Sequence, residues 1–229
     1  MFQEEFLFLI NMRATSEQVN QTIAFVKEQL SNAEGGHDWF HTERVYKNAL
    51  LIAKTEPVNT FVVALGALLH DIADSKFNNG DETIGPKMAR EFLFKLNVDS
   101  TIIEHVVNII ENISFKGGNE KQSFQSPELD VIQDADRLDA IGAIGIARCF
   151  NYGGFKNRQL YNPDIKPNLN MTKEEYKASK APTINHFYEK LLLLKDKMNT
   201  KTAKQIALQR HHYMETFLEQ FYKEWNGMS

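Results

Sequence analysis

The chain has 229 residues, of which 42% are hydrophobic and 24% charged, with a formal net charge of −4 at pH 7. Its length allows a substantial core, and its acidic balance gives no electrostatic reason to expect binding to nucleic acid or to a membrane surface. The single cysteine, Cys149, excludes an intrachain disulfide and favours a reducing, cytoplasmic location. Because Ile146, Ala147 and Phe150 surround it, we interpret Cys149 as core filler.

We expect residues 1–15 to form an N-terminal extension that need not be well ordered, followed by a single all-helical domain over 16–229. The first ten residues carry a short apolar patch behind two acids. They lack the basic start and the cleavage site of a secretory signal, and they are shorter than the roughly 20 apolar residues of a membrane span. Met12 is an alternative natural start, which the sequence leaves open.

Hydrophobic periodicity predicts helices along nearly the whole chain: residues 16–30, 38–54, 59–72, 83–96 and 100–112, one from Ser126 through Asp136, and two C-terminal helices, the last over about 200–225. Residues 152–182, rich in glycine, proline and polar residues, predict a long loop of the kind that forms lids or binding segments. No alternating strand pattern of any length occurs in the sequence. The expected fold class is therefore all-α.

The helix predicted over residues 59–72 is apolar on every side until it reaches His70 and Asp71. A helix of this composition is buried, so both polar side chains must lose water. An unpaired buried carboxylate costs several kcal/mol and persists only with a charged partner, dense hydrogen bonding or a bound metal. The pair therefore predicts the beginning of a coordination shell.

Two more polar residues share faces with apolar residues on other predicted helices. His41 recurs with Val45 and Ile52, and Asp136 follows Leu129 and Ile132. Two imidazoles and two carboxylates suit a borderline or hard divalent ion with positions left open for water and substrate.

The residues beside Asp136 are expected to have other roles. Asp134 lies about 200° away on the same helix and should face elsewhere. We expect Asp134 and Asp139 to be helix-surface residues or members of structural salt bridges rather than metal ligands.

The order of these residues resembles the HD-domain superfamily of metal-dependent phosphohydrolases, and in particular a bacterial branch of small single-domain members. The resemblance covers residues 16–225 and rests on four blocks: residues 36–45 (GHDWFHTERV), 68–74 (LLHDIAD), 133–142 (QDADRLDAIG) and 186–191 (HFYEKL). It implies an all-helical HD-domain fold with the metal site in the helix core. The matching ligands are His41, His70, Asp71 and Asp136.

The resemblance also implies a phosphohydrolase that cleaves a phosphate ester or a pyrophosphate bond of a small phosphorylated metabolite, with a nucleotide as the favoured class. Attack by metal-activated water is the expected chemistry. The expected cofactor is one divalent ion, with Mn²⁺ or Mg²⁺ favoured, although this ligand set also accommodates Fe²⁺, Co²⁺, Ni²⁺ or Zn²⁺.

Further roles follow from position along the chain. Asp74 and His37 are the candidate catalytic residues: Asp74 for holding a bridging water molecule or transferring a proton, and His37 for supporting a metal ligand or contacting the substrate. Arg44 and Lys76 are candidates for binding the phosphate, because in-line attack needs positive groups to offset the charge on the phosphoryl oxygens.

Two other functions stay open. A di-iron oxygenase on the HD fold needs extra histidines between Asp71 and Asp136, where the sequence has only His105, so a mononuclear site is favoured. A non-catalytic nucleotide-binding domain is the other alternative, because a fold and its ligands do not guarantee turnover. The oligomeric state, the substrate and the native metal also stay open.

Overall fold

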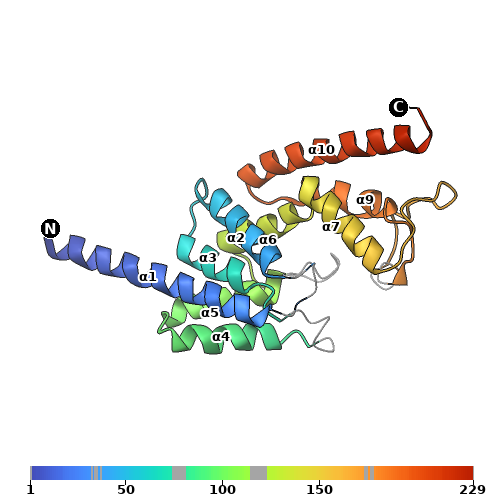
Figure 1. Ribbon diagram of the computed structural model, residues 1–229. Helices are drawn as coiled ribbons and strands as arrows, with labels where there is room; N and C mark the ends of the chain where they lie inside the picture. The colour runs from blue at the N-terminus through green and yellow to red at the C-terminus, as the bar shows by residue number, and fades with distance from the viewer. Residues whose placement is uncertain are drawn as a thin grey trace. The chain divides into compact units, whose positions relative to one another are not determined.

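A computed structural model describes the backbone of residues 2–31, 33, 36, 38–73, 81–113, 123–172, 175 and 178–228, and the side chains of these residues from Thr15 onward. All regular secondary structure in this part of the chain is helical, without a strand (Figure 1). The predicted all-α fold class is therefore confirmed. None of the described helices has the length and hydropathy needed to cross a lipid bilayer.

The chain forms two compact units, Met1–Ile132 and Gln133–Ser229; a single domain over 16–229 stays a prediction. The first unit contains α1 (Phe2–Gln29), α2 (Trp39–Ala53), α3 (Thr60–Leu69), α4 (Ile84–Lys95), α5 (Ser100–Ile113) and the start of α6 (Pro127–Asp139). Helix α1 begins well before the predicted start at Ser16. Residues 2–29 contain no proline or glycine, so no helix breaker separates the residues before Ser16 from the rest of the helix.

Helix α3 is the central element of the first unit and packs against α1, α2 and α5. Its N-cap is Asn59, whose side chain accepts hydrogen bonds from the backbone N–H groups of Phe61 (3.0 Å) and Val62 (3.3 Å). Every residue from Val62 to Leu69 is buried. At Gly66 a Cβ atom would lie only 2.6 Å from Cδ1 of Ile132, so glycine permits the close approach of α6.

The second unit contains the end of α6, then α7 (Gly142–Phe155), α9 (Asn185–Glu189), the 3₁₀ helix η2 (Leu191–Lys197) and α10 (Lys201–Trp225). The loop predicted over 152–182 starts later, because α7 continues to Phe155. Its Gly153 is buried, and a Cβ there would lie 2.2 Å from Oγ1 of Thr183. This glycine therefore permits close packing of α7 against Thr183 and does not end the helix.

A buried carboxylate ties α6 to the start of α10 within the second unit. Asp134, 0% exposed, accepts hydrogen bonds from the backbone N–H of Asn199 (2.8 Å), from the backbone N–H of Thr200 (2.7 Å) and from the Thr200 hydroxyl (2.9 Å). Arg137 lies 3.3 Å from the same carboxylate. For Asp134 the structural salt bridge is thus confirmed and a surface position is wrong.

Asp139, at the end of α6, is also a buried carboxylate in a salt bridge. Its side chain is buried and pairs with Arg148 of α7 at 2.6 Å. The guanidinium of Arg210 donates to the carbonyl oxygen of Leu138, which brings α10 to the same turn. Three helices of the second unit are therefore joined by charged hydrogen bonds.

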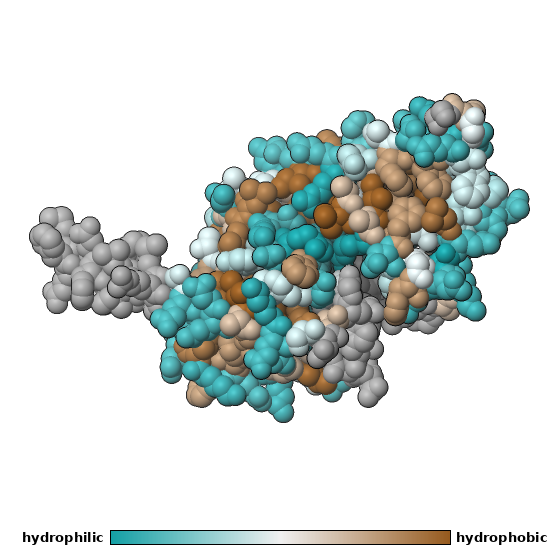
Figure 2. Space-filling view, in the orientation of Figure 1, coloured by the Kyte–Doolittle hydropathy of each residue, from teal (hydrophilic) through white to brown (hydrophobic). Residues whose placement is uncertain are grey.

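Helix α7 also leaves large apolar side chains exposed: Ile144, Tyr152 and Phe155. An apolar area lies over the part of the second unit where Figure 1 draws α7 (Figure 2). Nζ of Lys156 lies 4.9 Å from the ring centroid of Phe155, and Cζ of Arg158 lies 5.6 Å from that of Tyr152. Cation–π contacts thus partly cover the exposed rings.

Candidate metal centre

Three of the four predicted ligands come together in the first unit. His41, His70 and Asp71 each offer one ligand atom, and these atoms lie within 4.8 Å of one another. The centroids of the two imidazole rings are 5.5 Å apart, with an angle of 70° between the ring planes. This spacing allows one ion to be shared among the three side chains.

The capping of α2 directs His41 into the interior. The carboxylate of Asp38, the N-cap residue, accepts a hydrogen bond from the backbone N–H of His41 at 2.9 Å. His41 therefore sits in the first turn and shares a buried face with Val45 and Ile52. Its side chain is almost fully removed from solvent, as the periodicity of the sequence predicts.

His70 carries the most specific evidence for a bound ion. It is the C-cap residue of α3, and its Nδ1 lies 2.8 Å from the carbonyl oxygen of Ala67. A carbonyl oxygen only accepts hydrogen bonds, so Nδ1 bears the proton and Nε2 keeps its lone pair. Nε2 is buried and has no hydrogen-bond partner among the described residues. A buried lone pair of this kind fits a divalent ion, and histidine ligands commonly donate their other ring N–H to a carbonyl oxygen.

Asp136, the fourth predicted ligand, lies on α6 in the second unit and is half-buried. Its role stays a prediction.

The predicted catalytic and phosphate-binding residues are less well defined. His37, Asp74 and Lys76 lie outside the described residues. Arg44 is half-buried on α2, three residues after His41. Their proposed roles stay predictions.

His105 does not belong to the cluster of His41, His70 and Asp71. Its Nε2 lies 3.0 Å from the hydroxyl of Ser126 and 3.5 Å from Oε2 of Glu128. Its ring also makes an edge contact with Phe124. These contacts join α5 to the start of α6.

The carboxylate of Glu128 holds the N-cap residue of α3 and a histidine of α5 in place, a role that the sequence did not predict. Its side chain is nearly buried, and Oε1 accepts a hydrogen bond from the backbone N–H of Asn59 at 2.8 Å. One carboxylate thus contacts the N-cap residue of α3 and His105 of α5. An acidic residue in the first turn of a helix was visible in the sequence, but its partner lies 69 positions away.

Comparison with known proteins identifies relatives of this chain. The HD domain family model matches residues 39–141, which contain all four predicted ligands. An uncharacterized protein of Bacillus subtilis, YpgQ, is 35% identical over 213 residues, which cover 93% of this chain and 96% of YpgQ.

Solved structures extend the likeness to nearly the whole chain. A crystal structure of an HD-superfamily hydrolase from Bacillus thuringiensis is 46% identical, with a TM-score of 0.75 over 93% of this chain and 98% of that one. The structure of YpgQ in complex with ADP is 33% identical, with a TM-score of 0.73 over 92% of this chain and 96% of that one. Together with the helical fold, these likenesses assign the chain to a class of helical hydrolases. The chain belongs to the HD superfamily.

Proposed function

We propose that this protein is a metal-dependent phosphohydrolase that cleaves a phosphate ester or a pyrophosphate bond of a small phosphorylated metabolite, with a nucleotide as the favoured substrate class. The observation that carries the proposal is the buried Nε2 of His70, which has no hydrogen-bond partner in the described part of the chain and is grouped with ligand atoms of His41 and Asp71. The ADP complex of YpgQ, a relative along most of the chain, supports a nucleotide ligand.

His41, His70 and Asp71 are the residues that would hold the ion, with Asp136 as the proposed fourth ligand. The carboxylates favour Mn²⁺ or Mg²⁺, whereas the imidazoles also suit Fe²⁺, Co²⁺, Ni²⁺ or Zn²⁺. A bound divalent ion lowers the pKa of a coordinated water molecule and polarises a phosphoryl oxygen.

The chain's own groups would supply the rest of the reaction. The hydrogen bond from Nδ1 of His70 to Ala67 fixes the imidazole in one orientation. The buried residues of α3 exclude bulk water beneath the ligands and so strengthen electrostatic interactions there. We assign proton transfer to Asp74, support of a metal ligand or contact with the substrate to His37, and compensation of phosphoryl charge to Arg44 and Lys76.

A panel of nucleoside mono-, di- and triphosphates, incubated with the full chain and Mn²⁺ or Mg²⁺, tests the proposal. We expect release of phosphate or pyrophosphate from at least one nucleotide. Asp71→Asn should lower the rate on the order of 10³-fold, because it removes a charged ligand. Asp164→Asn, at an exposed position of the second unit, is the matched control and should leave the rate unchanged.

Other results would assign another function. Nucleotide binding without turnover of any compound, in protein that holds stoichiometric metal, would contradict the hydrolase and favour a binding domain. Two irons per chain together with oxygen uptake would favour the oxygenase.

A further inference from the structure

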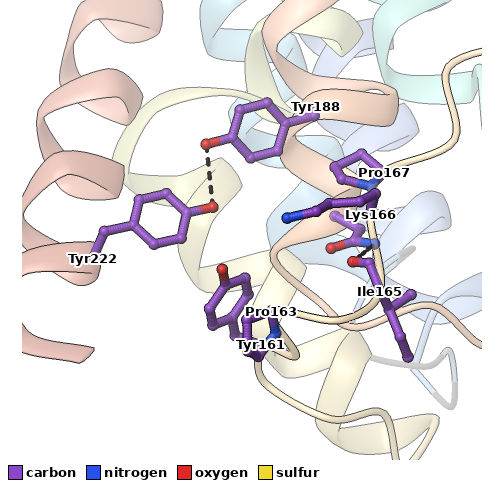
Figure 3. Close-up of a pocket in the computed structure, with 8 residues that line it drawn as sticks. Tyr161, Pro163, Ile165, Lys166, Pro167, Tyr188 and Tyr222 are labelled. Atoms are coloured by element: carbon purple, nitrogen blue, oxygen red, sulfur yellow. Dashed lines mark hydrogen bonds between the residues drawn. The ribbon is translucent and has the colours of Figure 1, made fainter. Parts of the chain in front are cut away.

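A cavity of about 300 Å³ lies in the second unit, between the segment from Tyr161 to Pro167 and the helices α9 and α10 (Figure 3). None of the eight described residues that line it is acidic, and none belongs to the proposed metal centre. Its volume is at the small end of the range typical of small-molecule sites. The cavity therefore suits a compact ligand.

Hydrogen-bond donors converge on this cavity. The hydroxyl of Tyr188 donates to the hydroxyl of Tyr222 at 3.2 Å. One bond between two hydroxyls uses one proton, so the proton of Tyr222 is left to donate to a ligand. In Figure 3 the hydroxyl of Tyr161 and the amino group of Lys166 point toward the same space. Burial raises the pKa of Tyr222, which keeps its hydroxyl protonated.

The walls of the cavity are apolar and held in place. Pro163 and Pro167 both line the cavity (Figure 3). The ring of Tyr161 is fixed by edge contacts with Tyr222 and Trp225, at centroid distances of 5.3 and 5.0 Å. These rings offer a surface for a flat or aliphatic group.

Hydrogen bonds also fix the lining segment to α9. The side-chain amide of Asn185 donates to the carbonyl oxygen of Ile165 at 3.1 Å, and this asparagine is 1% exposed. Oε1 of Glu189 accepts a hydrogen bond from the backbone N–H of Asn168 at 3.1 Å. The cavity is thus formed before any ligand binds, which lowers the entropy cost of binding.

We propose that this cavity binds a small organic oxyanion, a phosphomonoester or a carboxylate, attached to a compact apolar or aromatic body. The hydroxyls of Tyr161 and Tyr222 and the Lys166 ammonium receive the anionic group, because each has a proton to donate and none of the described lining residues is acidic. The proline and tyrosine rings contact the body. This inference does not depend on the proposed hydrolase activity.

Isothermal titration of the full chain, stripped of divalent ions on a chelating resin, tests the site without contribution from the metal centre. The probes are adenosine monophosphate, phenylacetate and inorganic phosphate. We expect at least one organic probe to bind more tightly than inorganic phosphate. Its Kd should rise about tenfold in Tyr222→Phe and in Lys166→Gln, which each remove one donor to a charged ligand.

Two variants on α10 serve as matched controls. Tyr213→Phe and Lys204→Gln change exposed residues that do not line the cavity, and they should leave Kd unchanged. Tightest binding of adenosine monophosphate would identify the ligand as a phosphomonoester, and tightest binding of phenylacetate would identify it as a carboxylate. The proposal is overturned if no probe binds, if inorganic phosphate binds as tightly as both organic probes, or if Tyr222→Phe binds like the parent chain.

Discussion

Nδ1 of His70 lies 2.8 Å from the carbonyl oxygen of Ala67, so the histidine is held by the helix that it caps. The bond selects the tautomer whose free lone pair is on Nε2, an atom that is buried and without a partner among the described residues. Leaving such an atom unsatisfied has a desolvation cost. Metal binding would remove that cost, and several consequences can be measured.

We expect His70→Gln to weaken binding of Mn²⁺ at least about 100-fold, because the loss of a direct ligand should exceed the 10–100-fold effect of losing an outer hydrogen-bond partner. Titration calorimetry with Mn²⁺ measures the change. His212→Gln is the control, since the side chain of His212 is 80% exposed. Equal Mn²⁺ affinity in His70→Gln and the parent chain would remove His70 from the ligand set.

Asp134→Ala should lower the free energy of unfolding by about 3 kcal/mol, because it leaves the N–H groups of Asn199 and Thr200 without their acceptor and the charge of Arg137 without its ion-pair partner. Urea denaturation followed by circular dichroism measures the loss. Asp164→Ala, at an exposed position, should change stability by less than about 0.5 kcal/mol. A similarly small effect at Asp134 would mean that this network does not stabilise the second unit.

Cys149 should be nearly inert in the folded chain. Burial raises the pKa of its thiol to about 12, only partly offset by the positive charge of Arg158, so almost none is thiolate at pH 8. We expect alkylation by iodoacetamide at pH 8 to be at least about 100-fold slower in the folded protein than in urea. Mass spectrometry of the labelled chain follows both reactions. Comparable rates would show that this part of α7 opens readily.

His186 should make stability depend on pH. Burial, together with the positive charges of Lys190 and Arg158, lowers the pKa of its imidazole to about 4. As pH falls from 6.5 toward 4, the unfolded chain binds a proton that the folded chain does not, so stability is full above pH 6.5 and is lost toward pH 4. Between pH 7 and pH 5 the imidazole of His186 should lower the free energy of unfolding by about 2 kcal/mol.

The contribution of His186 is isolated by a difference between variants. The free energy of unfolding of His186→Asn should fall less between pH 7 and pH 5 than that of the parent chain, by about 2 kcal/mol. His212→Asn should retain the parent slope, because that side chain is 80% exposed. Identical slopes in all three proteins would contradict the lowered pKa.

Helical periodicity predicted that His41, His70 and Asp71 belong to buried helices, and the resemblance to the HD-domain superfamily grouped them. His41 follows the buried face of α2, and the apolar run of α3 ends at the other two residues. The signal is strong because each residue lies on a face whose neighbours are unambiguously apolar. The tautomer of His70 could not be predicted, because it depends on where a backbone carbonyl lies at the last turn.

Contacts between distant segments were the part that the sequence did not predict. Helical periodicity places Asp134 on a face other than that of Asp136. Nothing in the sequence indicates that the backbone N–H groups of Asn199 and Thr200 donate to it there. The cavity could not be predicted from the sequence for the same reason. Tyr161, Tyr188 and Tyr222 belong to three segments, and only the tertiary fold brings their hydroxyls together.

The burial of α3 has a consequence for the time scale of motion at the candidate metal centre. From Val62 to Leu69 every residue is buried, and a Cβ atom at Gly66 would lie 2.6 Å from Cδ1 of Ile132. We expect such a helix to resist small shifts and its amide hydrogens to exchange with solvent only when the surrounding unit opens. We therefore expect His70 to keep its position for as long as the first unit stays folded.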